Sequence, residues 1–456
     1  MAEENRMQEL EQAPVGRLLF KYSLPAVVAM VAYSLYNVIA SIYIGHGVGD
    51  MALSGLAVAF PVMNLTFALG TLVGLGSAAV CSIRLGQQDR EGAFRVLGTD
   101  LVLSIALGVA FGWGLVPFLA PLLVWFGASP ATLPHAYDFM LVTLWCLPLT
   151  YCFFNLNHVM RATGYPHKAM GSAMITVVAN VVIAPILVFR LRWGMTGAAI
   201  ATGLAQVAGL LWVLGHFRDS GHVVHFRRRI YALQGRTVRA VCAIGLAPCL
   251  VNLCGCIVVV VINKMLLLHG GDLAVGAYGI INRILTLFAM VVIGLTQGMQ
   301  PIAGYNFGAG RLDRVLRVLK YGILGGTAIT SLGFVLCELV PGAITRMFTS
   351  GETLIEIAVR GLRISVVVWV LVGSQIVIGN FFQAIGKPPL SFFLSLTRQL
   401  LFLVPLLLVL PGFYGERGVW LSFPIADLLS VVVGFAALFQ FLRRMRPRQP
   451  FRNEET

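Results

Sequence analysis

Charged residues are scarce in this sequence. They make up 11% of the 456 residues, whereas hydrophobic residues make up 58%; a soluble globular domain carries about 25% charged residues. The composition therefore excludes a soluble protein and predicts an all-α polytopic membrane protein. The net charge of +14 does not indicate nucleic-acid binding, because the basic residues are spread over short segments between apolar runs.

Motifs for nucleotide binding and hydrolysis are also missing. The P-loop pattern G-x-x-x-x-G-K-[ST] does not occur; Gly386-Lys387 comes closest, but Pro388 stands where Ser or Thr is needed. Neither H-E-x-x-H nor a loop-borne Ser/His/Asp set is present. The eight cysteines lie inside apolar runs, where free cysteine behaves as a small hydrophobe, so we expect neither disulfides nor a metal site. The sequence predicts no enzyme and no cofactor, and any uphill work would draw on a proton or sodium gradient.

Long apolar runs dominate what is present. Runs of roughly 20 residues are long enough to cross a bilayer as helices. Most of the 33 lysines and arginines fall in alternate connections between these runs, which predicts that both termini are cytoplasmic and that the chain lies in the inner or plasma membrane. The twelve predicted spans are 18–45, 53–82, 97–118, 137–160, 169–189, 195–217, 240–268, 274–303, 319–341, 357–382, 391–410 and 419–442.

A constant shift of 222 residues relates the two halves of the chain. It places Gly76, Gly86 and Arg95 on Gly298, Gly308 and Arg317, and places Ala162, Gly164 and Pro166 on Ala384, Gly386 and Pro388. Because six spans, an even number, separate each residue from its counterpart, both copies enter the membrane from the same side. The sequence thus predicts twelve transmembrane helices in two parallel six-helix repeats, related by a pseudo-twofold axis along the membrane normal, with a substrate site between them.

The repeat also predicts the domain organisation. We expect an N-terminal lobe at 1–217, a cytoplasmic basic linker at 218–239, a C-terminal lobe at 240–442 and a cytoplasmic tail at 443–456. The linker contains three consecutive arginines at 227–229, which we interpret as a topology and lipid-headgroup anchor.

Uncharged polar residues inside the spans of the first lobe are candidates for lining a substrate cavity. Burying such groups without a partner is costly, so they either serve a site or form hydrogen bonds between helices. Several share a helix face at i, i+4 spacing. The candidates are Asn37 and Ser41, Thr176 and Asn180, Thr202 and Gln206, together with Asn64, Asn155 and Asn157.

The second lobe carries charge within its spans. Arg398 lies about eight residues into its span from the inner side, and Asp427 about eight residues into the next span from the outer side. At about 1.5 Å rise per residue in a core of roughly 30 Å, their depths differ by about 6 Å, which an arginine side chain can bridge. We expect a buried ion pair that fixes this lobe. A role in ion translocation is the alternative, although a permanently paired acid is poorly suited to cycling protons. Glu338, near the outer end of its span, is a further ion-coupling candidate.

Linked short motifs resemble the multidrug and toxic compound extrusion (MATE) family, most closely its MepA-like branch. The resemblance implies a two-lobed antiporter that exports amphipathic, often cationic, organic compounds by alternating access in exchange for protons or sodium, and it adds Tyr36 to the cavity residues. The matching motifs are Tyr36-Asn37, Gly55 to Pro61, Arg161 to Gly164, Gly197 to Thr202, Gln300-Pro301 with Tyr305 to Ala309, Gln383 to Lys387, Arg398-Gln399, and Gly418 to Trp420 with Pro424 to Asp427.

Two acids expected from this resemblance are absent. The family usually has an aspartate four residues after the tyrosine of Tyr36-Asn37, where this chain has Ala40, and another before the proline of span 5, where it has Ala184. Cation coupling in the first lobe is attributed to that pair. Three interpretations follow: an antiporter coupled through the second lobe, an uncoupled facilitator, or a lipid-linked oligosaccharide flippase of the same superfamily. In each case we expect a small-molecule or lipid substrate, a lipid environment and a monomer, without nucleic acid or nucleotide.

Overall fold

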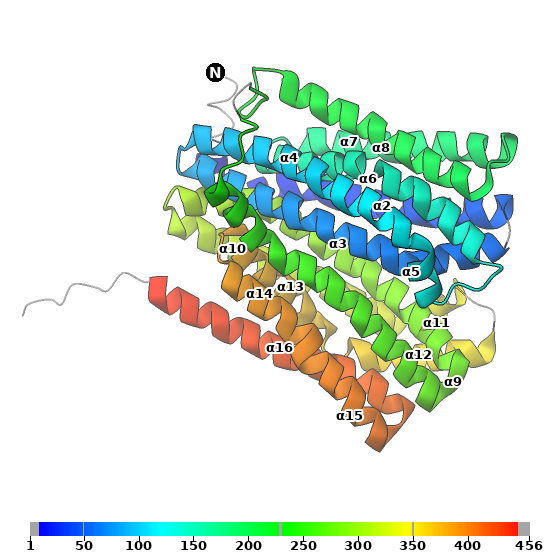
Figure 1. Ribbon diagram of the computed structural model, residues 1–456. Helices are drawn as coiled ribbons and strands as arrows, with labels where there is room; N and C mark the ends of the chain where they lie inside the picture. Colours follow the sequence, from blue (N-terminus) through cyan, green and yellow to red (C-terminus); the bar gives the residue numbers. More distant parts are fainter. Residues whose placement is uncertain (1–8, 49, 228–229, 349–350, 446–456) are drawn as a thin grey trace, which may run out of the picture.

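The computed structural model describes residues 9–48, 50–227, 230–348 and 351–445, and every regular element in these ranges is helical (Figure 1). The first half of the chain forms α2 (Val15–Gly47), α3 (Asp50–Gly86), α4 (Arg90–Leu115), α5 (Leu119–Trp125), α6 (Leu133–Ala162), α7 (Pro166–Pro185) and α8 (Gly194–Arg218). The second half forms α9 (Gly235–Gly308), α10 (Leu312–Leu339), α11 (Pro341–Arg346), α12 (Glu352–Val366), α13 (Trp369–Ala384), α14 (Pro388–Leu396), α15 (Val404–Tyr414) and α16 (Glu416–Met445). Short 3₁₀ or π segments, η1 (Val116–Phe118), η2 (Ile186–Arg190) and η3 (Thr397–Leu403), continue α4, α7 and α14.

The number of membrane-spanning helices agrees with the sequence prediction. Within the described ranges, 11 helices are long and apolar enough to cross a membrane, and the count reaches 12 if α12 and α13 form one span bent by 57°. The long helix α9 contains two of these spans, because Gly271 (φ 71°) breaks its helical geometry. The predicted span 357–382 is the one that bends.

Helix starts and turns follow local chemistry. Asp89 caps α4 by accepting a hydrogen bond of 2.8 Å from the Gly92 N–H. Burial opposes ionisation of Asp89, but the Gly92 N–H and the Arg84 guanidinium outweigh it, so its pKa lies below the ordinary value. Gly164 (φ +93°) and Gly386 (φ +68°) occupy repeat-related turns in a backbone region that favours glycine. The shift that relates the two halves therefore also relates their turns.

Helix packing repeats between the halves. In the first half α3, α4 and α8 pack against α6, and α2 and α8 pack against α7; in the second half α9, α10 and α16 pack against α13, and α9 and α16 pack against the α14–α15 span and its π segment. The two halves meet chiefly where α2 and α3 contact α9. This is the arrangement expected of two copies of one six-helix unit.

Both halves place equivalent connections at the same end of the bundle. The first described residues, the connection from α8 to α9 and the end of α16 lie together at the left of Figure 1, as do the turns after α3 and after α9. We call this the basic end, because Arg84, Arg95, Arg311 and Arg317 lie there. The irregular part of the predicted linker is shorter than 218–239, since α8 ends at Arg218 and α9 begins at Gly235.

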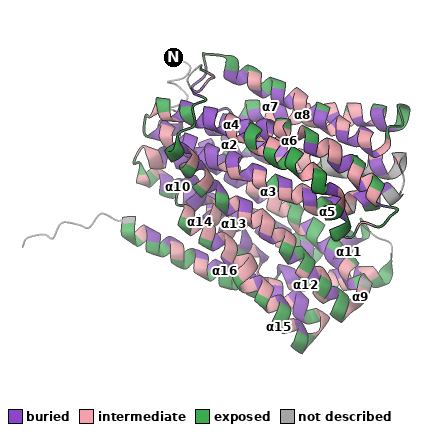
Figure 2. Cartoon of the chain, viewed as in Figure 1, coloured by how far each residue is buried: buried purple, intermediate pink, exposed green. Residues whose placement is uncertain are grey.

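Large apolar side chains are exposed along the outer surface of the bundle. Phe20, Phe118 and Phe413 are 67%, 65% and 78% exposed, and Figure 2 shows exposed and intermediate positions along the outer helices with buried positions turned inward. Exposed apolar surface on this scale is unfavourable in water and favourable against lipid. The bundle thus has the surface of a membrane-embedded protein.

Candidate functional site at the junction of the two halves

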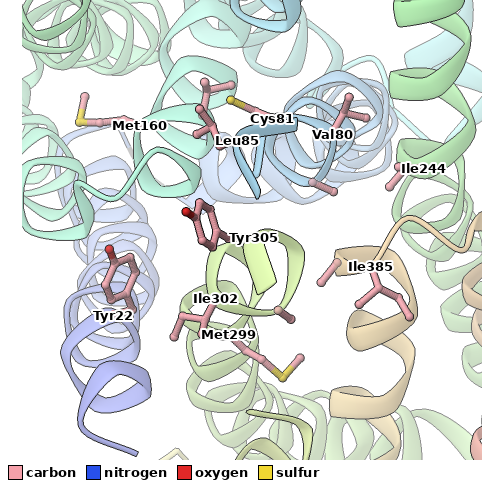
Figure 3. Close-up of a cluster of buried hydrophobic side chains, with 14 of the residues drawn as sticks. Tyr22, Val80, Cys81, Leu85, Met160, Ile244, Met299, Ile302, Tyr305 and Ile385 are labelled. Carbon is pink, nitrogen blue, oxygen red and sulfur yellow. The ribbon is translucent and has the colours of Figure 1, made fainter. Parts of the chain in front are cut away.

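Buried apolar side chains join the two halves at the basic end. One continuous cluster includes Tyr22 and Leu85 from the first half and Met299, Tyr305 and Ile385 from the second (Figure 3). Towards the opposite end the described residues form separate clusters. Ile44 and Leu144 belong to a cluster drawn from the first half alone, and Ile262, Tyr278 and Trp420 to one drawn from the second half alone. The halves therefore share a core at the basic end and have separate cores at the other.

Backbone atoms meet where the two halves are closest. A Cβ added to Gly86 would lie 1.9 Å from the carbonyl oxygen of Tyr305, and one added to Gly308 would lie 2.1 Å from the carbonyl oxygen of Ile83. Gly86 and Ile83 are the counterparts of Gly308 and Tyr305 under the 222-residue shift, so the two contacts are reciprocal. The pseudo-twofold axis thus passes between α3 and α9 at this point.

The same reciprocity extends to the next turns. A Cβ on Gly76 would lie 3.2 Å from the backbone nitrogen of Gly245, and one on Gly298 would lie 2.5 Å from that of Ser23. Gly76 corresponds to Gly298, and Ser23 to Gly245. At Gly76 and Gly298 only glycine allows the helices of the two halves to approach so closely.

A polar cluster also spans the junction. Arg161 on α6 donates a hydrogen bond to Gln297 on α9, and its guanidinium lies 2.7 Å from His158 Nδ1. Gln300 donates to the carbonyl oxygen of Leu75 at 3.2 Å. Arg161 is only 8% exposed, so its hydrogen bond to Gln297 in the other half is formed with little competition from water. These side chains connect the halves at the level of the shared core.

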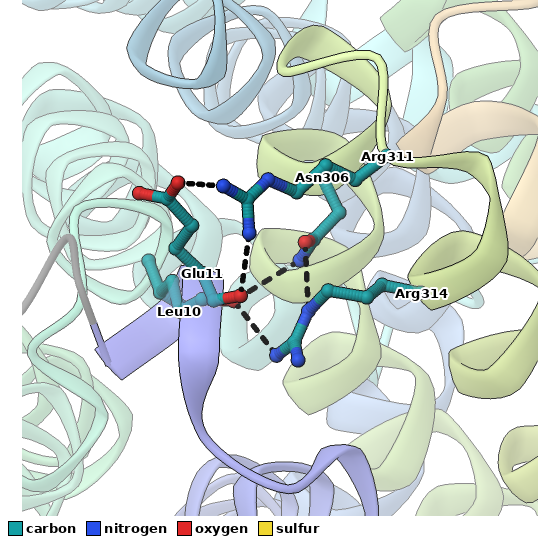
Figure 4. A network of polar contacts seen from close by, with 5 residues as sticks. All are labelled: Leu10, Glu11, Asn306, Arg311 and Arg314. Carbon is teal, nitrogen blue, oxygen red and sulfur yellow. Dashed lines mark hydrogen bonds and ion pairs between the residues drawn. The ribbon is translucent and has the colours of Figure 1, made fainter.

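The N-terminal segment is fastened across the junction as well. Arg314 donates to the carbonyl oxygens of Leu10 (3.1 Å) and Ala13 (2.7 Å), and Asn306 donates to that of Leu10 (3.2 Å). Arg311 forms an ion pair with Glu11 (Figure 4). Residues 10–13 of the first half are thereby held against the start of α10.

Most of the predicted cavity residues form hydrogen bonds inside the first half. Asn155 donates to Ser104 Oγ at 2.8 Å, and Asn157 donates to Ser172 Oγ at 2.6 Å. Asn180 donates to Thr202 at 3.3 Å. A role of these residues in a substrate cavity stays a prediction. The remaining ones are placed as follows: Thr176 donates to a carbonyl oxygen of its own helix, Gln206 bonds to Thr150, Asn64 is partly buried, and the side chains of Tyr36, Asn37 and Ser41 lie outside the described residues.

The three charged candidates of the second half all form ion pairs. Arg398 Nε lies 2.6 Å from Asp427 Oδ1, with the carboxyl side chain 4% exposed. Arg398 lies in the π-helical segment η3, whose wider turn is a frequent feature of functional sites. Glu338 lies 3.7 Å from Arg363 near the opposite end. The predicted Arg398–Asp427 pair is present, and its role stays a prediction.

Apolar side chains surround one of the two positions where an acid was expected. Ala184 is 4% exposed and packs in a small cluster with Leu187 and Ala201. Such a pocket would oppose the ionisation of a carboxyl group. Ala184 fits this apolar pocket without an ionisable group.

One buried acid escaped the sequence analysis. Asp100, on α4, is 0% exposed, and neither carboxyl oxygen has a hydrogen-bond partner in the described ranges. The sequence prediction named only uncharged polar residues in the spans of the first lobe, although Asp100 falls inside the predicted span 97–118. The presence of an acid within an apolar run was the signal from which this residue could have been identified. As for metals, within the part of the chain that the structure describes no group of three or more His, Cys, Asp or Glu residues could hold an ion.

Comparison with known proteins identifies the family. The MatE family model matches residues 25–186 and 243–409. The multidrug export protein MepA of Staphylococcus aureus (strain MSSA476) is 25% identical over 451 residues, which cover 97% of each chain. The structure of the MATE multidrug transporter DinF-BH in complex with R6G superposes with a TM-score of 0.87 at 34% identity, covering 94% of this chain and 96% of that one. An outward-facing multidrug resistance MATE transporter of the MOP superfamily shares the fold, with a TM-score of 0.89 at 24% identity and coverage of 95% and 97%. With its family model matched across both halves, the chain belongs to the MATE family of membrane transporters.

Proposed function

We propose that the protein exports amphipathic, often cationic, organic compounds by alternating access, as a proton or sodium antiporter. The observation that carries the proposal is the unequal junction: one core shared at the basic end and separate cores at the opposite end. If the basic end is cytoplasmic, this conformation is sealed towards the cytoplasm. The relatives named as a multidrug export protein and a multidrug transporter support the substrate class.

Alternating access requires the contact across the axis to open during transport. Gln87 and Ala309 flank the reciprocal glycines: the Ala309 nitrogen lies 3.0 Å from a Cβ on Gly86, and the Gln87 nitrogen 3.2 Å from a Cβ on Gly308. The test introduces Gln87→Cys and Ala309→Cys after the eight native cysteines are replaced. Oxidation should stop efflux from proteoliposomes, and reduction should restore it.

The single-cysteine proteins are the controls, since oxidation should leave their transport unchanged. Undiminished efflux through a fully cross-linked double variant would contradict alternating access at this junction. The experiment does not depend on the identity of the coupling ion.

Coupling is tested separately by imposing pH and sodium gradients one at a time. Acceleration by one gradient identifies the antiported ion. The apolar surroundings of Ala184 favour a second candidate function, an uncoupled facilitator, which would equilibrate substrate without responding to either gradient. Equilibration of that kind would remove the antiporter proposal.

We extend the proposal to the setting of the protein: a monomer in the lipid bilayer of the plasma membrane, with lobes at 1–217 and 240–442, the linker between them and both termini cytoplasmic. The positive-inside distribution of arginines supports this orientation. A cysteine at Arg95, an exposed position at the basic end, should react with an impermeant maleimide only in inverted membranes. Labelling in intact cells would reverse the orientation.

A further inference from the structure

Asp100 has the environment of a group that binds and releases a proton. Its side chain is 0% exposed, and both carboxyl oxygens lack a hydrogen-bond partner in the described part of the chain. The Ser77 hydroxyl of α3 faces it, although no hydrogen bond of normal geometry joins the two. Thr99 next to it also has a buried hydroxyl without a partner among the described residues. The site is thus polar, enclosed and unsatisfied.

The ionisable neighbours of Asp100 carry no positive charge. Cys81 from α3 and Cys152 from α6 lie within electrostatic range of its carboxyl group. Among the described residues, α9 and the α8–α9 connection add no charged group that acts on it. A carboxylate with neither water nor a counter-charge is strongly unfavourable. The carboxyl group can remain here only while it holds its proton.

The second half shows that the fold does not need this polar group. Under the 222-residue shift, Ser77 corresponds to Met299 and Asp100 to Gly322, and a Cβ on Gly322 would lie 2.9 Å from the Met299 sulfur. The neighbouring pair Ser104 and Asn155, joined at 2.8 Å, corresponds to Gly326 and Val377, and a Cβ on Gly326 would lie 2.9 Å from a methyl group of Val377. The same packing position is therefore filled by apolar groups in one half and by a buried acid cluster in the other.

The acid lies directly behind a contact between the halves. Gly76 precedes Ser77 on α3, and a Cβ on Gly76 would lie 2.2 Å from the carbonyl oxygen of Val241 in the second half. A Cβ on Gly245 would lie closer still, 1.7 Å from the carbonyl oxygen of Leu72. A displacement of α3 that let water reach Asp100 would disturb these contacts, because no free space separates the helices.

We propose that Asp100 is the proton-binding carboxyl group of the first half, and that losing its proton accompanies separation of the two halves at the basic end. The inference rests on the proposed antiport and names the proton as its ion. In the sealed conformation the carboxyl group is protonated between α3, α4 and α6. When the basic end opens, water solvates the carboxylate and accepts the proton. The protein then reseals with cationic substrate bound, and a proton that enters from the opposite side rebinds to Asp100 as the substrate leaves, so that one proton crosses the membrane in each cycle.

The experiment uses the full chain and two readouts. Difference infrared spectroscopy should detect a buried protonated carboxyl group that D100N removes and Asp138→Asn, at an exposed position of the same half, retains. In proteoliposomes D100N should still exchange substrate at equilibrium but lose the acceleration by a pH gradient. An unchanged infrared band, or gradient-driven transport equal to that of the wild type, would overturn the proposal.

A second variant guards against misfolding. Asp100→Gly combined with Ser77→Met installs the pair found at Gly322 and Met299, so it should fold, exchange substrate and lack the infrared band and the gradient response. Different results would refute the proposed antiport and the proposed role of Asp100. A wild-type protein without gradient response refutes antiport, whereas the infrared band alone decides whether Asp100 holds a proton.

Discussion

Replacing either glycine at the pseudo-twofold axis with alanine should open the basic end. A Cβ on Gly86 would lie 1.9 Å from the Tyr305 carbonyl oxygen, about 1.5 Å short of the 3.4 Å at which ordinary contact begins. The obstacle is main chain, which cannot rotate away as a side chain would. The helices must therefore separate in the sealed conformation, whereas a conformation in which the halves are apart is unaffected.

The size of the effect follows from the cost of overpacking, about 1–3 kcal/mol. A free energy of this size shifts a two-state equilibrium by roughly 5- to 150-fold. Gly86→Ala and Gly308→Ala should act with similar strength, because their contacts are reciprocal at 1.9 and 2.1 Å. The double variant should favour the open conformation more than either single variant.

Spin labels at Arg95→Cys and Arg317→Cys report the separation directly, since these exposed counterparts lie one in each half. Both glycine variants should add a longer distance to the pulsed electron resonance distribution. Gly114→Ala and Gly279→Ala are matched controls, because nothing lies within 4 Å of a Cβ at either position; they raise helix propensity without a clash. Distributions identical to the wild type in folded axis variants would refute the reasoning.

Two further predictions concern polar contacts. Asp427→Asn with Arg398 intact should lower the free energy of unfolding by about 1–3 kcal/mol, because Arg398, whose side chain is 30% exposed, loses a charge-assisted hydrogen bond. A thermal shift in detergent measures this, and unaltered stability with lost gradient-driven transport would instead assign the pair to ion coupling. Arg314→Ala should speed amide exchange in residues 10–13, whose carbonyl groups at Leu10 and Ala13 it holds; exchange at the wild-type rate would mean that other contacts fasten this segment.

The sequence was sufficient to predict the helical architecture. Apolar run length predicted the spans, and the 222-residue shift predicted the parallel repeats, because both depend on patterns along the chain. The bend between α12 and α13 was not predicted. It falls inside a continuous apolar run, and no proline marks the break after Val366.

Contacts between helices were harder to predict. Asn155 and Asn157 are two residues apart and point to different neighbours, α4 and α7, yet apolar residues surround both along the sequence. No amphipathic stripe indicates which side of such a helix faces the other half. Gly86 and Gly308 were recognised as counterparts in a turn, but their contact with each other's half requires the fold.

Asp100 was missed for a related reason. An acid a few residues inside an apolar run can reach the headgroup region or stay buried, and the sequence does not distinguish these cases. In the folded protein, packing among α3, α4 and α6 keeps the carboxyl group of Asp100 buried. Its counterpart Gly322 does not indicate an acid at position 100, because the repeat preserves backbone positions more faithfully than side-chain chemistry.

Main-chain atoms, rather than side chains, form the closest contact between the halves. Repulsion between such atoms rises steeply over a few tenths of an ångström, and the attraction that balances it fades almost as quickly. The basic end should therefore have two stable conformations, closed and open, with few stable intermediates between them. Ligands that bind elsewhere would change the population of the open conformation. They would hardly change the separation of the halves in the closed conformation.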